Sequence, residues 1–264
     1  MTRSYLMSIF AVLAAVVLAG CAQQTTDVVA PVQPSLPIAP ASQPLQQAPA
    51  PTQPNPPVPT ATFPPVPTPK PVNFSGSGDE LTAEFDLTNG LLVLEASHSG
   101  SGNFIVQLLS AEGDRELSIN AIGAYSGVRG HQVKEGALFA LAPGAFRVEV
   151  NADGPWTVDL SQPQWNQGAD LPVSYEGDGD TVMGPFRLVT GLLPAEFSHS
   201  GSGNFMVQLA SSDGESVEFL VNEIGAYQGS QAITVRDGSL FDTAPGIYAL
   251  VVNADGPWTV SLGN

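Results

Sequence analysis

The chain has few basic residues, one cysteine and three histidines among its 264 residues. Its eight Lys and Arg are scattered and are outnumbered by 25 Asp and Glu, so no basic face is available to neutralise nucleic-acid phosphates. The single cysteine excludes a disulfide framework and a cysteine-ligated metal site. The formal net charge of -17 instead indicates a self-repelling surface that faces water.

Only one apolar run is long, and it lies at the N-terminus. It extends from Leu6 to Ala19 after the positively charged Arg3, and it is short for a membrane span. The letters "LAGC" at 18–21 resemble the lipobox of bacterial lipoproteins. This resemblance implies that residues 1–20 are a signal peptide and that Cys21 carries the lipid, including palmitate. An ordinary secretory signal with a chance cysteine is the alternative.

The lipoprotein resemblance also implies a partner and a location. Two or three acyl chains, at about 0.8 kcal/mol per buried methylene, hold a protein on a lipid bilayer almost permanently. Ala22 follows the cysteine in place of the Asp that commonly retains lipoproteins at an inner membrane. We therefore expect a protein of the bacterial cell envelope, anchored through Cys21 and facing outside the cytoplasm, at the cell surface or the outer membrane.

A proline-rich segment follows the cysteine. Residues 31–71 contain 16 prolines, mixed with Gln, Thr, Ala and Val. Such a segment lacks backbone donors for regular structure and has too little apolar surface to fold, so it favours extended polyproline II. We interpret residues 21–72 as a disordered tether with a reach on the order of 150 Å, from ~3.1 Å per residue.

The rest of the chain is a tandem duplication. The word "SHSGSGNF" at 97–104 returns at 198–205, and "NADGPWTV" at 151–158 returns at 253–260. The offset changes by one residue between Gly214 and Asn222, and about half of the aligned positions are identical. The predicted domains are 73–162 and 174–264, joined by a connector at 163–173.

Within each copy the apolar residues alternate. Phe104, Val106 and Leu108 return unchanged in the second copy, whereas the residues between them change. Alternation with a period of two, in which one of the two sets of residues is identical in both copies, indicates β-strands that place one face in a core. Turn words such as "APG" and "ADGP" separate these runs. The sequence predicts an all-β protein with two tandem, jelly-roll-like β-sandwich domains after the signal peptide and the disordered linker.

The repeated histidines come at the end of apolar strand faces. His98 and His199 share the parity of the buried residues before them and precede the "GSGN" turn. We interpret each as a half-buried imidazole that donates to a loop carbonyl and accepts from a serine or a backbone amide. A Ser-His catalytic site is the alternative, but no Gly-x-Ser-x-Gly elbow or orienting partner accompanies it.

Two further repeated words are assigned structural roles. Asn120 and Asn222 belong to "NAIGAY" and "NEIGAY", and Trp156 and Trp258 begin the last strand of each copy. The alternating pattern turns both tryptophans inward, which argues against an exposed indole that stacks on a sugar. Trp165 in the connector has no counterpart in the second copy.

An acidic turn is the one candidate metal site. Glu176, Asp178 and Asp180 occupy alternate positions with glycines between them, and the first copy keeps Asp79. A flexible loop rich in carboxylates suits Ca²⁺, although neither copy has the twelve-residue hand pattern. A solvated acidic turn is the favoured interpretation, so no cofactor is expected and calcium is kept as the alternative.

The words "SHSGSGNF", "NEIGAY.GS" and "ADGPWTV" resemble a domain that recurs in uncharacterised secreted proteins of bacteria. The ending "APGAFRVEVNAD" is also similar to pre-peptidase C-terminal domains, and this likeness implies non-catalytic β-sandwiches appended to secreted enzymes. Neither resemblance implies a ligand.

We expect a lipid-anchored protein that is not an enzyme and that displays two β-sandwich modules for binding or for an envelope-structural role. Calcium-dependent adhesion or glycan binding is the alternative, with an envelope glycan or a surface protein as the partner; a hydrolase is less favoured, because no catalytic constellation is present. Outward positions differ between the copies, as in Arg147 against Ala249 and Glu149 against Val251. The two domains therefore need not bind the same ligand.

Overall fold

The computed structural model describes residues 69–137, 140–238 and 242–263. The expected signal peptide, Cys21 and nearly all of the tether lie outside these residues. All described residues fall in one compact unit, Thr62–Asn264. Its regular elements are antiparallel strands, and no helix among the described residues is long and apolar enough to cross a membrane.

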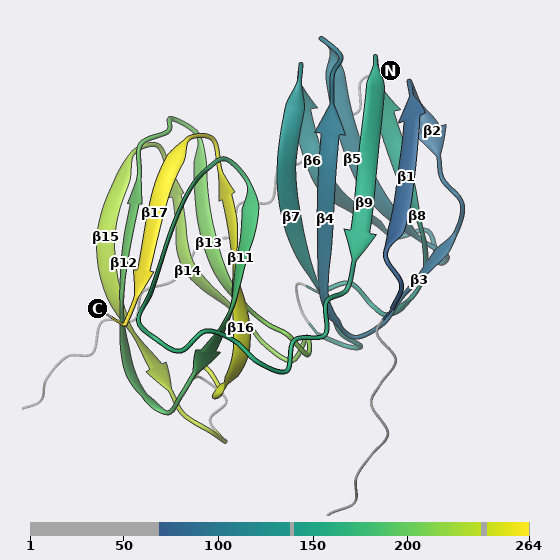
Figure 1. Ribbon diagram of the computed structural model, residues 1–264. Coiled ribbons are helices and arrows are strands. Elements are labelled where there is room, and N and C mark those ends of the chain that lie inside the picture. Colours follow the sequence, from purple (N-terminus) through teal and green to yellow (C-terminus); the bar gives the residue numbers. More distant parts are fainter. Residues whose placement is uncertain (1–68, 138–139, 239–241, 264) are drawn as a thin grey trace, which may run out of the picture. The chain divides into compact units, whose positions relative to one another are not determined.

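The first repeat consists of two sheets (Figure 1). One sheet has the order β1-β9-β4-β7, and in the other β2 and β3 both pair with β8 and the order continues β8-β5-β6. The strands of this repeat are β1 (Val72–Ser77), β2 (Glu80–Leu81), β3 (Phe85–Leu87), β4 (Gly90–His98), β5 (Asn103–Ser110), β6 (Arg115–Ile122), β7 (Tyr125–Val133), β8 (Gly144–Ala152) and β9 (Pro155–Ser161).

The second repeat has the same topology in sheets β10-β17-β12-β15 and β11-β16-β13-β14. With β2 and β3 counted as one interrupted strand, the sheets of each repeat have the orders 1-8-3-6 and 2-7-4-5. This is a double-sheet jelly roll, as the sequence predicts. The strands are β10 (Val173–Asp178), β11 (Thr181–Leu188), β12 (Gly191–His199), β13 (Asn204–Ser211), β14 (Val217–Ile224), β15 (Tyr227–Val235), β16 (Gly246–Ala254) and β17 (Pro257–Leu262).

Each repeat encloses its own hydrophobic core. Phe104, Val106 and Leu108 are fully buried, and their counterparts in the second repeat are buried equally. The alternation of the sequence is therefore confirmed as an inward and an outward set. Trp156 and Trp258 lie in these cores with 2% of their surface exposed, which confirms their inward orientation.

A third buried cluster lies outside the two cores and was not predicted. Leu91 of β4 packs there with Ala210, Ala249 and Val251 of the second repeat, and Trp165 of the connector covers it. The outward residues Ala249 and Val251 are 0% and 2% exposed. Their difference from Arg147 and Glu149 therefore reflects burial, which corrects the expectation that these positions are free exteriors.

Polar contacts join the same two repeats. The Gln132 side chain donates to the backbone oxygens of Ser211 and Ser216 at 3.1 and 3.2 Å. Arg129 forms an ion pair with Asp180 at 3.0 Å, and Lys134 forms one with Glu215. The contacts of Gln132 and Lys134 lie beside the turn at 214–217, where the second repeat has its extra residue, and Asp180 lies in the turn between β10 and β11.

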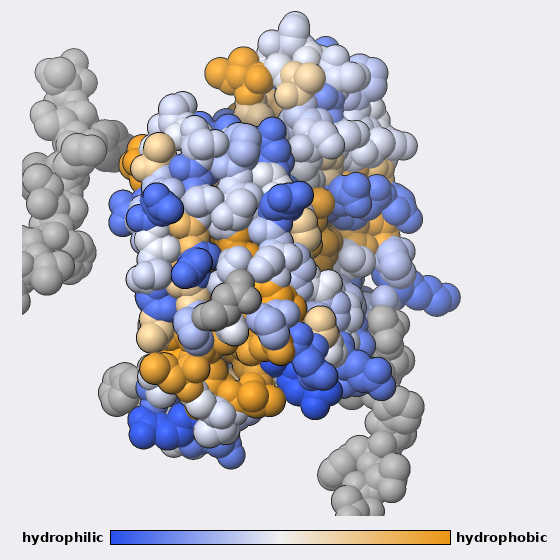
Figure 2. Space-filling view, turned by 60° about the vertical axis from the view of Figure 1, so that its left-hand side comes forward, coloured by the Kyte–Doolittle hydropathy of each residue, from blue (hydrophilic) through white to orange (hydrophobic). Residues whose placement is uncertain are grey.

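The surface is largely hydrophilic but carries hydrophobic patches, as one face shows in Figure 2. Ile122 and Ile224 are the most exposed large hydrophobic residues that the structure describes, each with 81% exposure. Both end the strand that follows the first β-hairpin turn of their repeat, β6 and β14. Their matched exposure indicates that the outer face of this sheet is not covered at that end in either repeat.

Candidate functional site

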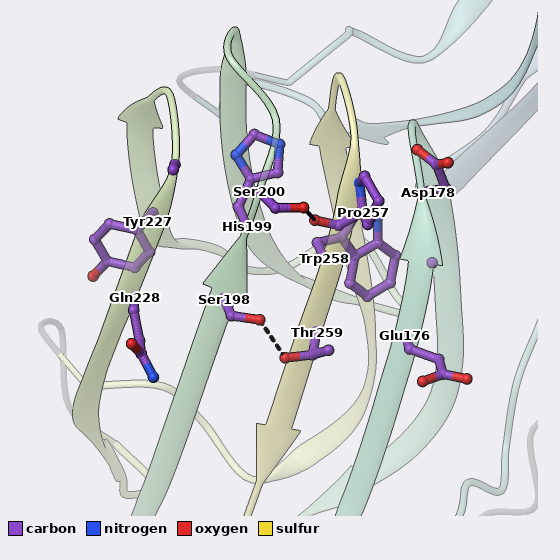
Figure 3. A pocket seen from close by; sticks show the side chains of 12 residues that line it. Glu176, Asp178, Ser198, His199, Ser200, Tyr227, Gln228, Pro257, Trp258 and Thr259 are labelled. Atoms are coloured by element: carbon purple, nitrogen blue, oxygen red, sulfur yellow. Dashed lines mark hydrogen bonds between the residues drawn. The ribbon is translucent and has the colours of Figure 1, made fainter.

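A row of polar side chains crosses the outer face of the β10-β17-β12-β15 sheet. The strand register places Glu176 opposite Thr259, Thr259 opposite Ser198, and Ser198 opposite Gln228. One residue thus comes from each of the four strands, and Figure 3 shows the four side chains side by side. Their parity is opposite to that of the buried His199 and Trp258, so they face away from the core.

This row lines an open pocket of about 980 Å³ in the second repeat. Asp178, Ser200 and Pro257 lie at the turn end of the sheet, and His199, Tyr227 and Trp258 also contribute to the lining. The hydroxyls of Ser198 and Thr259 are 2.7 Å apart and hydrogen-bond to each other. The pocket therefore presents hydroxyls, an amide and two carboxylates, the groups that bind polar, hydroxylated or cationic ligands.

His199 is held by contacts with the neighbouring loops. Its Nδ1 lies 2.8 Å from the backbone oxygen of Gly225, and because a carbonyl oxygen only accepts, Nδ1 carries the proton. Its Nε2 lies 3.2 Å from Asp255 Oδ1 without forming a directional hydrogen bond. The ring stacks on Phe205 with centroids 4.7 Å apart. This imidazole is fixed in place on every side.

Asp255 connects the imidazole to the turn before β13. Its Oδ2 accepts from the backbone nitrogens of Ser202 and Gly203 at 3.1 and 2.6 Å, and from the Ser202 hydroxyl at 3.2 Å. Partial burial acts to raise the pKa of this carboxyl, but the bonds from Gly203 and Ser202 and the nearby His199 outweigh it and hold the pKa below its usual value. The carboxylate caps a tight turn.

The first repeat has the same arrangement. His98 Nδ1 lies 2.8 Å from the oxygen of Gly123, and Nε2 lies 3.2 Å from Asp153. Partial burial acts to raise the pKa of Asp153, but hydrogen bonds from Gly102 and Ser101 hold it below its usual value. The prediction of a loop carbonyl as one partner is confirmed. Half-burial and a serine or amide partner are wrong, because the imidazoles are 3% and 4% exposed and face aspartates.

Glycines allow these close contacts. A Cβ at Gly201 would overlap both Asp255 and His199, and a Cβ at Gly177 would overlap the Trp258 indole. The Trp258 nitrogen donates to the backbone oxygen of Gly179 at 3.0 Å. The repeated Gly-rich words therefore provide room for the side chains that close one end of the sandwich.

The four predicted calcium ligands do not come together. Glu176 and Asp178 are exposed on one face of β10, where they line the pocket. Asp180 accepts from the Tyr125 hydroxyl at 3.0 Å and pairs with Arg129, and Asp79 accepts from the backbone of Ala152. Among the described residues no three His, Cys, Asp or Glu side chains form a group that could hold a metal ion.

The remaining predicted residues lie on another surface. Asn120 and Asn222 are exposed on the outer face of the other sheet of each repeat, where they support no core. Sequence reasoning missed Ser198, Thr259 and Gln228. Ser198 and Thr259 directly adjoin His199 and Trp258, so the alternating pattern marks them as outward, but only the strand register reveals that they are neighbours.

The arrangement in the pocket favours binding over acid-base chemistry. The hydroxyl partner of Ser198 is another hydroxyl, and no serine hydroxyl hydrogen-bonds to His98 or His199 among the described residues. Glu176 is separated from Ser198 by the whole of strand β17. A serine nucleophile needs a base within hydrogen-bond reach, and this geometry does not provide one.

No family model matches the chain, and no curated protein matches it. Among solved structures the chain is similar to an oxalate decarboxylase of Lactobacillus farciminis in a formate complex, with 10% identity and a TM-score of 0.16 over 68% of this chain and 75% of that chain. An oxalate decarboxylase of Bacillus subtilis gives 9% identity and a TM-score of 0.16 over 74% of this chain and 73% of that chain. Matches this distant carry no argument about activity.

Proposed function

We propose that this protein is a lipid-anchored binding protein of the bacterial cell envelope and not an enzyme. Cys21 attaches it to a membrane outside the cytoplasm, at the cell surface or the outer membrane, and the proline-rich segment holds two jelly rolls away from the lipid. The "LAGC" word, the 16 prolines of residues 31–71 and the acidic composition support this proposal.

One observation carries the non-catalytic part of the proposal. The imidazole of the pocket is 4% exposed, its Nδ1 donates to Gly225 and its ring stacks on Phe205 beside Asp255, so it faces the core and not a bound ligand. Around it lie only hydroxyls, an amide and exposed carboxylates. Such a set can hold a polar ligand, and it lacks the base that would activate a nucleophile.

The anchor is tested by metabolic labelling with a fatty acid. The wild-type chain should incorporate the label and sediment with membranes, and Cys21→Ala should incorporate none and be released or misprocessed. Unchanged membrane retention of Cys21→Ala contradicts the anchor. The binding role is tested by a screen with ester, peptide and glycoside substrates. Turnover that His199→Ala abolishes, without a change in melting temperature, would show an enzyme.

Calcium-dependent adhesion is the second candidate. Glu176 and Asp178 lie on the same face of β10, beside the hydroxyl of Thr259. The first repeat has serines at the matching positions, Ser75 and Ser77. Equilibrium dialysis of the full chain against calcium should detect binding that Glu176→Ser with Asp178→Ser removes. Absence of binding by the wild-type chain rejects this candidate and leaves the binding proposal intact.

A further inference from the structure

A set of amide and aliphatic side chains is repeated on the outer face of the second sheet of each jelly roll. In the first repeat this set, which we call the amide face, consists of Asn103, Ile105, Gln107, Asn120, Ile122 and Asn151. In the second repeat the same positions are Asn204, Met206, Gln208, Asn222, Ile224 and Asn253. Five of the six residues are therefore identical, and the sixth is a change between two apolar side chains.

The strand register groups these residues closely. Ile105 lies directly between Asn120 of β6 and Asn151 of β8, and Asn103 lies opposite Ile122. Opposite Cβ atoms in a sheet are about 5 Å apart, so two amides flank one apolar side chain within roughly 10 Å. Met206 has the same position between Asn222 and Asn253.

The rest of the same outer face has diverged completely. At the other end of these strands, Leu109, Arg147 and Glu149 of the first repeat are replaced by Ala210, Ala249 and Val251. Those replacements are buried in the cluster between the repeats. One half of the face therefore changed with its surroundings, and the amide half kept five of its six residues although these are exposed or partly exposed in both repeats.

Folding does not account for the amide face. Asparagine is disfavoured in strands, and no packing constraint fixes residues such as Ile122 and Ile224, each 81% exposed. No side-chain hydrogen bond of the six asparagines is present within the described part of the chain. The turn near Asn151 is capped by Asp153 and not by Asn151.

From this we propose that the amide face of each repeat binds an uncharged glycan. Each Asn or Gln side chain offers two donors and one acceptor, which match the donor and acceptor capacity of sugar hydroxyls. The apolar side chain between two amides, together with the exposed Ile122 or Ile224, provides a surface for the C–H face of a sugar ring. The inference rests on the proposed binding function and adds a second site and a ligand class to it.

The amide face itself offers no charge to a ligand, and the nearby Arg129 guanidinium is paired with Asp180. None of the six residues of either amide face is charged, although the chain as a whole carries a net charge of -17. An acidic glycan would be repelled by that net charge, and a cationic ligand would be drawn to the acidic surfaces elsewhere. The amide face of the second repeat lines a groove of about 770 Å³ that contains Phe219, itself 48% exposed. Residues of the first repeat also line this groove, among them Asn120, Arg129 and Glu116.

The test is affinity electrophoresis of the full chain in gels that contain galactomannan, mixed-linkage β-glucan, xylan or dextran, with polygalacturonate as the acidic comparison. At least one neutral polysaccharide should slow the wild-type chain, and polygalacturonate should not. Asn120→Ala with Asn151→Ala, and Asn222→Ala with Asn253→Ala, should each weaken retention, and the four changes together should weaken it at least roughly tenfold, because several hydrogen bonds are lost.

Matched controls separate this site from the pocket. Arg147→Ala copies the residue of the second repeat at an exposed position outside the amide face and should retain wild-type retardation. Glu176→Ser copies the first repeat within the pocket and reports whether the pocket holds the polysaccharide instead. The isosteric set Asn120→Asp with Asn222→Asp should also lose retention, which guards against a misfolded alanine variant. Melting curves of all variants should match the wild type.

Three results overturn the inference directly, and a fourth moves the ligand to the pocket. They are retardation by no neutral polysaccharide, retardation that the fourfold variant keeps, and self-association of the chain that the fourfold variant abolishes, since this last result assigns the amide face to a second copy. Loss of retardation in Glu176→Ser alone would place the ligand in the pocket, so the proposed function would stand without the amide face. Release of reducing ends from the polysaccharide would instead contradict the proposed function.

Discussion

The two jelly rolls have the same strand topology and nearly the same amide face, but they differ where they meet. They also share a histidine clamp, by which we mean a buried imidazole that contacts a loop carbonyl and an aspartate: His98 with Gly123 and Asp153, and His199 with Gly225 and Asp255. Arg147 and Glu149 of the first repeat are partly exposed, and Glu149 pairs with Arg115. Their counterparts Ala249 and Val251 are buried against Leu91. The difference teaches that divergence between internal repeats can mark an interface, and need not mark a second ligand.

The row of polar side chains on the outer face of the histidine-containing sheet shows a second kind of difference between the repeats. In the first repeat the register aligns Ser75, Thr157, Ser97 and Ser126, a row of hydroxyls. In the second repeat Glu176 and Gln228 replace the two outermost serines, and the central Ser-Thr hydrogen bond stays at 2.7 Å in both. The scaffold is thus constant, and the ends of the row distinguish the repeats.

The largest effect is expected from an exchange of residues at the interface. Val251→Glu gives the second repeat the residue of the first and buries a carboxylate without a partner, which should cost about 3 kcal/mol of unfolding free energy. The reciprocal Glu149→Val acts on the surface and should change stability by about 0.5 kcal/mol at most. Urea unfolding of both variants measures this, and equally small changes would contradict the buried interface.

The next effect concerns the histidine clamp. His98→Ala and His199→Ala each remove a buried hydrogen bond and a stacked ring, and each should cost on the order of 1 to 3 kcal/mol. Since the two clamps have the same distances, the two losses should be similar. Ser99→Ala and Ser200→Ala, which change exposed neighbours, are the controls. Losses that differ strongly between the repeats would show that the clamps are not equivalent.

The sequence was sufficient for the parts that local pattern determines. The alternation of Phe104, Val106 and Leu108 and the repeated words led to an all-β sandwich fold, because a period of two and turn residues act over a few neighbours. The inward Trp258 follows from the same pattern. The loop carbonyl partner of each histidine also follows, because the imidazole ends an inward strand face beside a turn.

The polar row and the clamp partner could not be predicted in the same way. Glu176, Thr259, Ser198 and Gln228 are distant along the chain, and only the jelly-roll register brings them together. Asp255 lies in the repeated "NADGPW" word, but its approach to His199 depends on how two turns pack. The interface was missed because Leu91 and Val251 sit on outward parity, where an apolar residue has many explanations.

One pH effect, above pH 4, should arise in the first repeat only. His131 of β7 is largely buried, and desolvation together with the nearby Arg129 lowers its pKa to about 4. It contacts Ser118, and Glu116 lies 3.9 Å away. In the unfolded chain, His131 binds a proton near pH 6.5. The contribution of His131 to the free energy of unfolding is therefore complete above that pH and declines as the pH falls toward 4.

The second repeat has Ile233 at the position of His131. His131→Ile should therefore remove this part of the pH dependence, and the wild-type chain should lose about 1 kcal/mol more than the variant between pH 7 and pH 5.5. Urea unfolding at the two pH values measures the difference. An equal loss in both chains would mean that His131 takes up its proton equally in the folded and the unfolded chain.

The smallest effect should come from the aspartates of the clamp and should be equal in both repeats. Asp153 and Asp255 have pKa values below the usual range, chiefly because backbone hydrogen bonds outweigh partial burial. A depressed carboxyl pKa stabilises the fold above the unfolded value, near pH 3.9, and this stabilisation is lost as the pH falls through the folded value.

Asp153→Asn and Asp255→Asn keep an oxygen that can accept from the turn but remove the charge. Each variant should therefore unfold less steeply with acid below pH 4, with little change at pH 7. Thermal melting from pH 2.5 to 7 measures this, and a steep acid transition that persists in the double variant would assign it to other carboxylates.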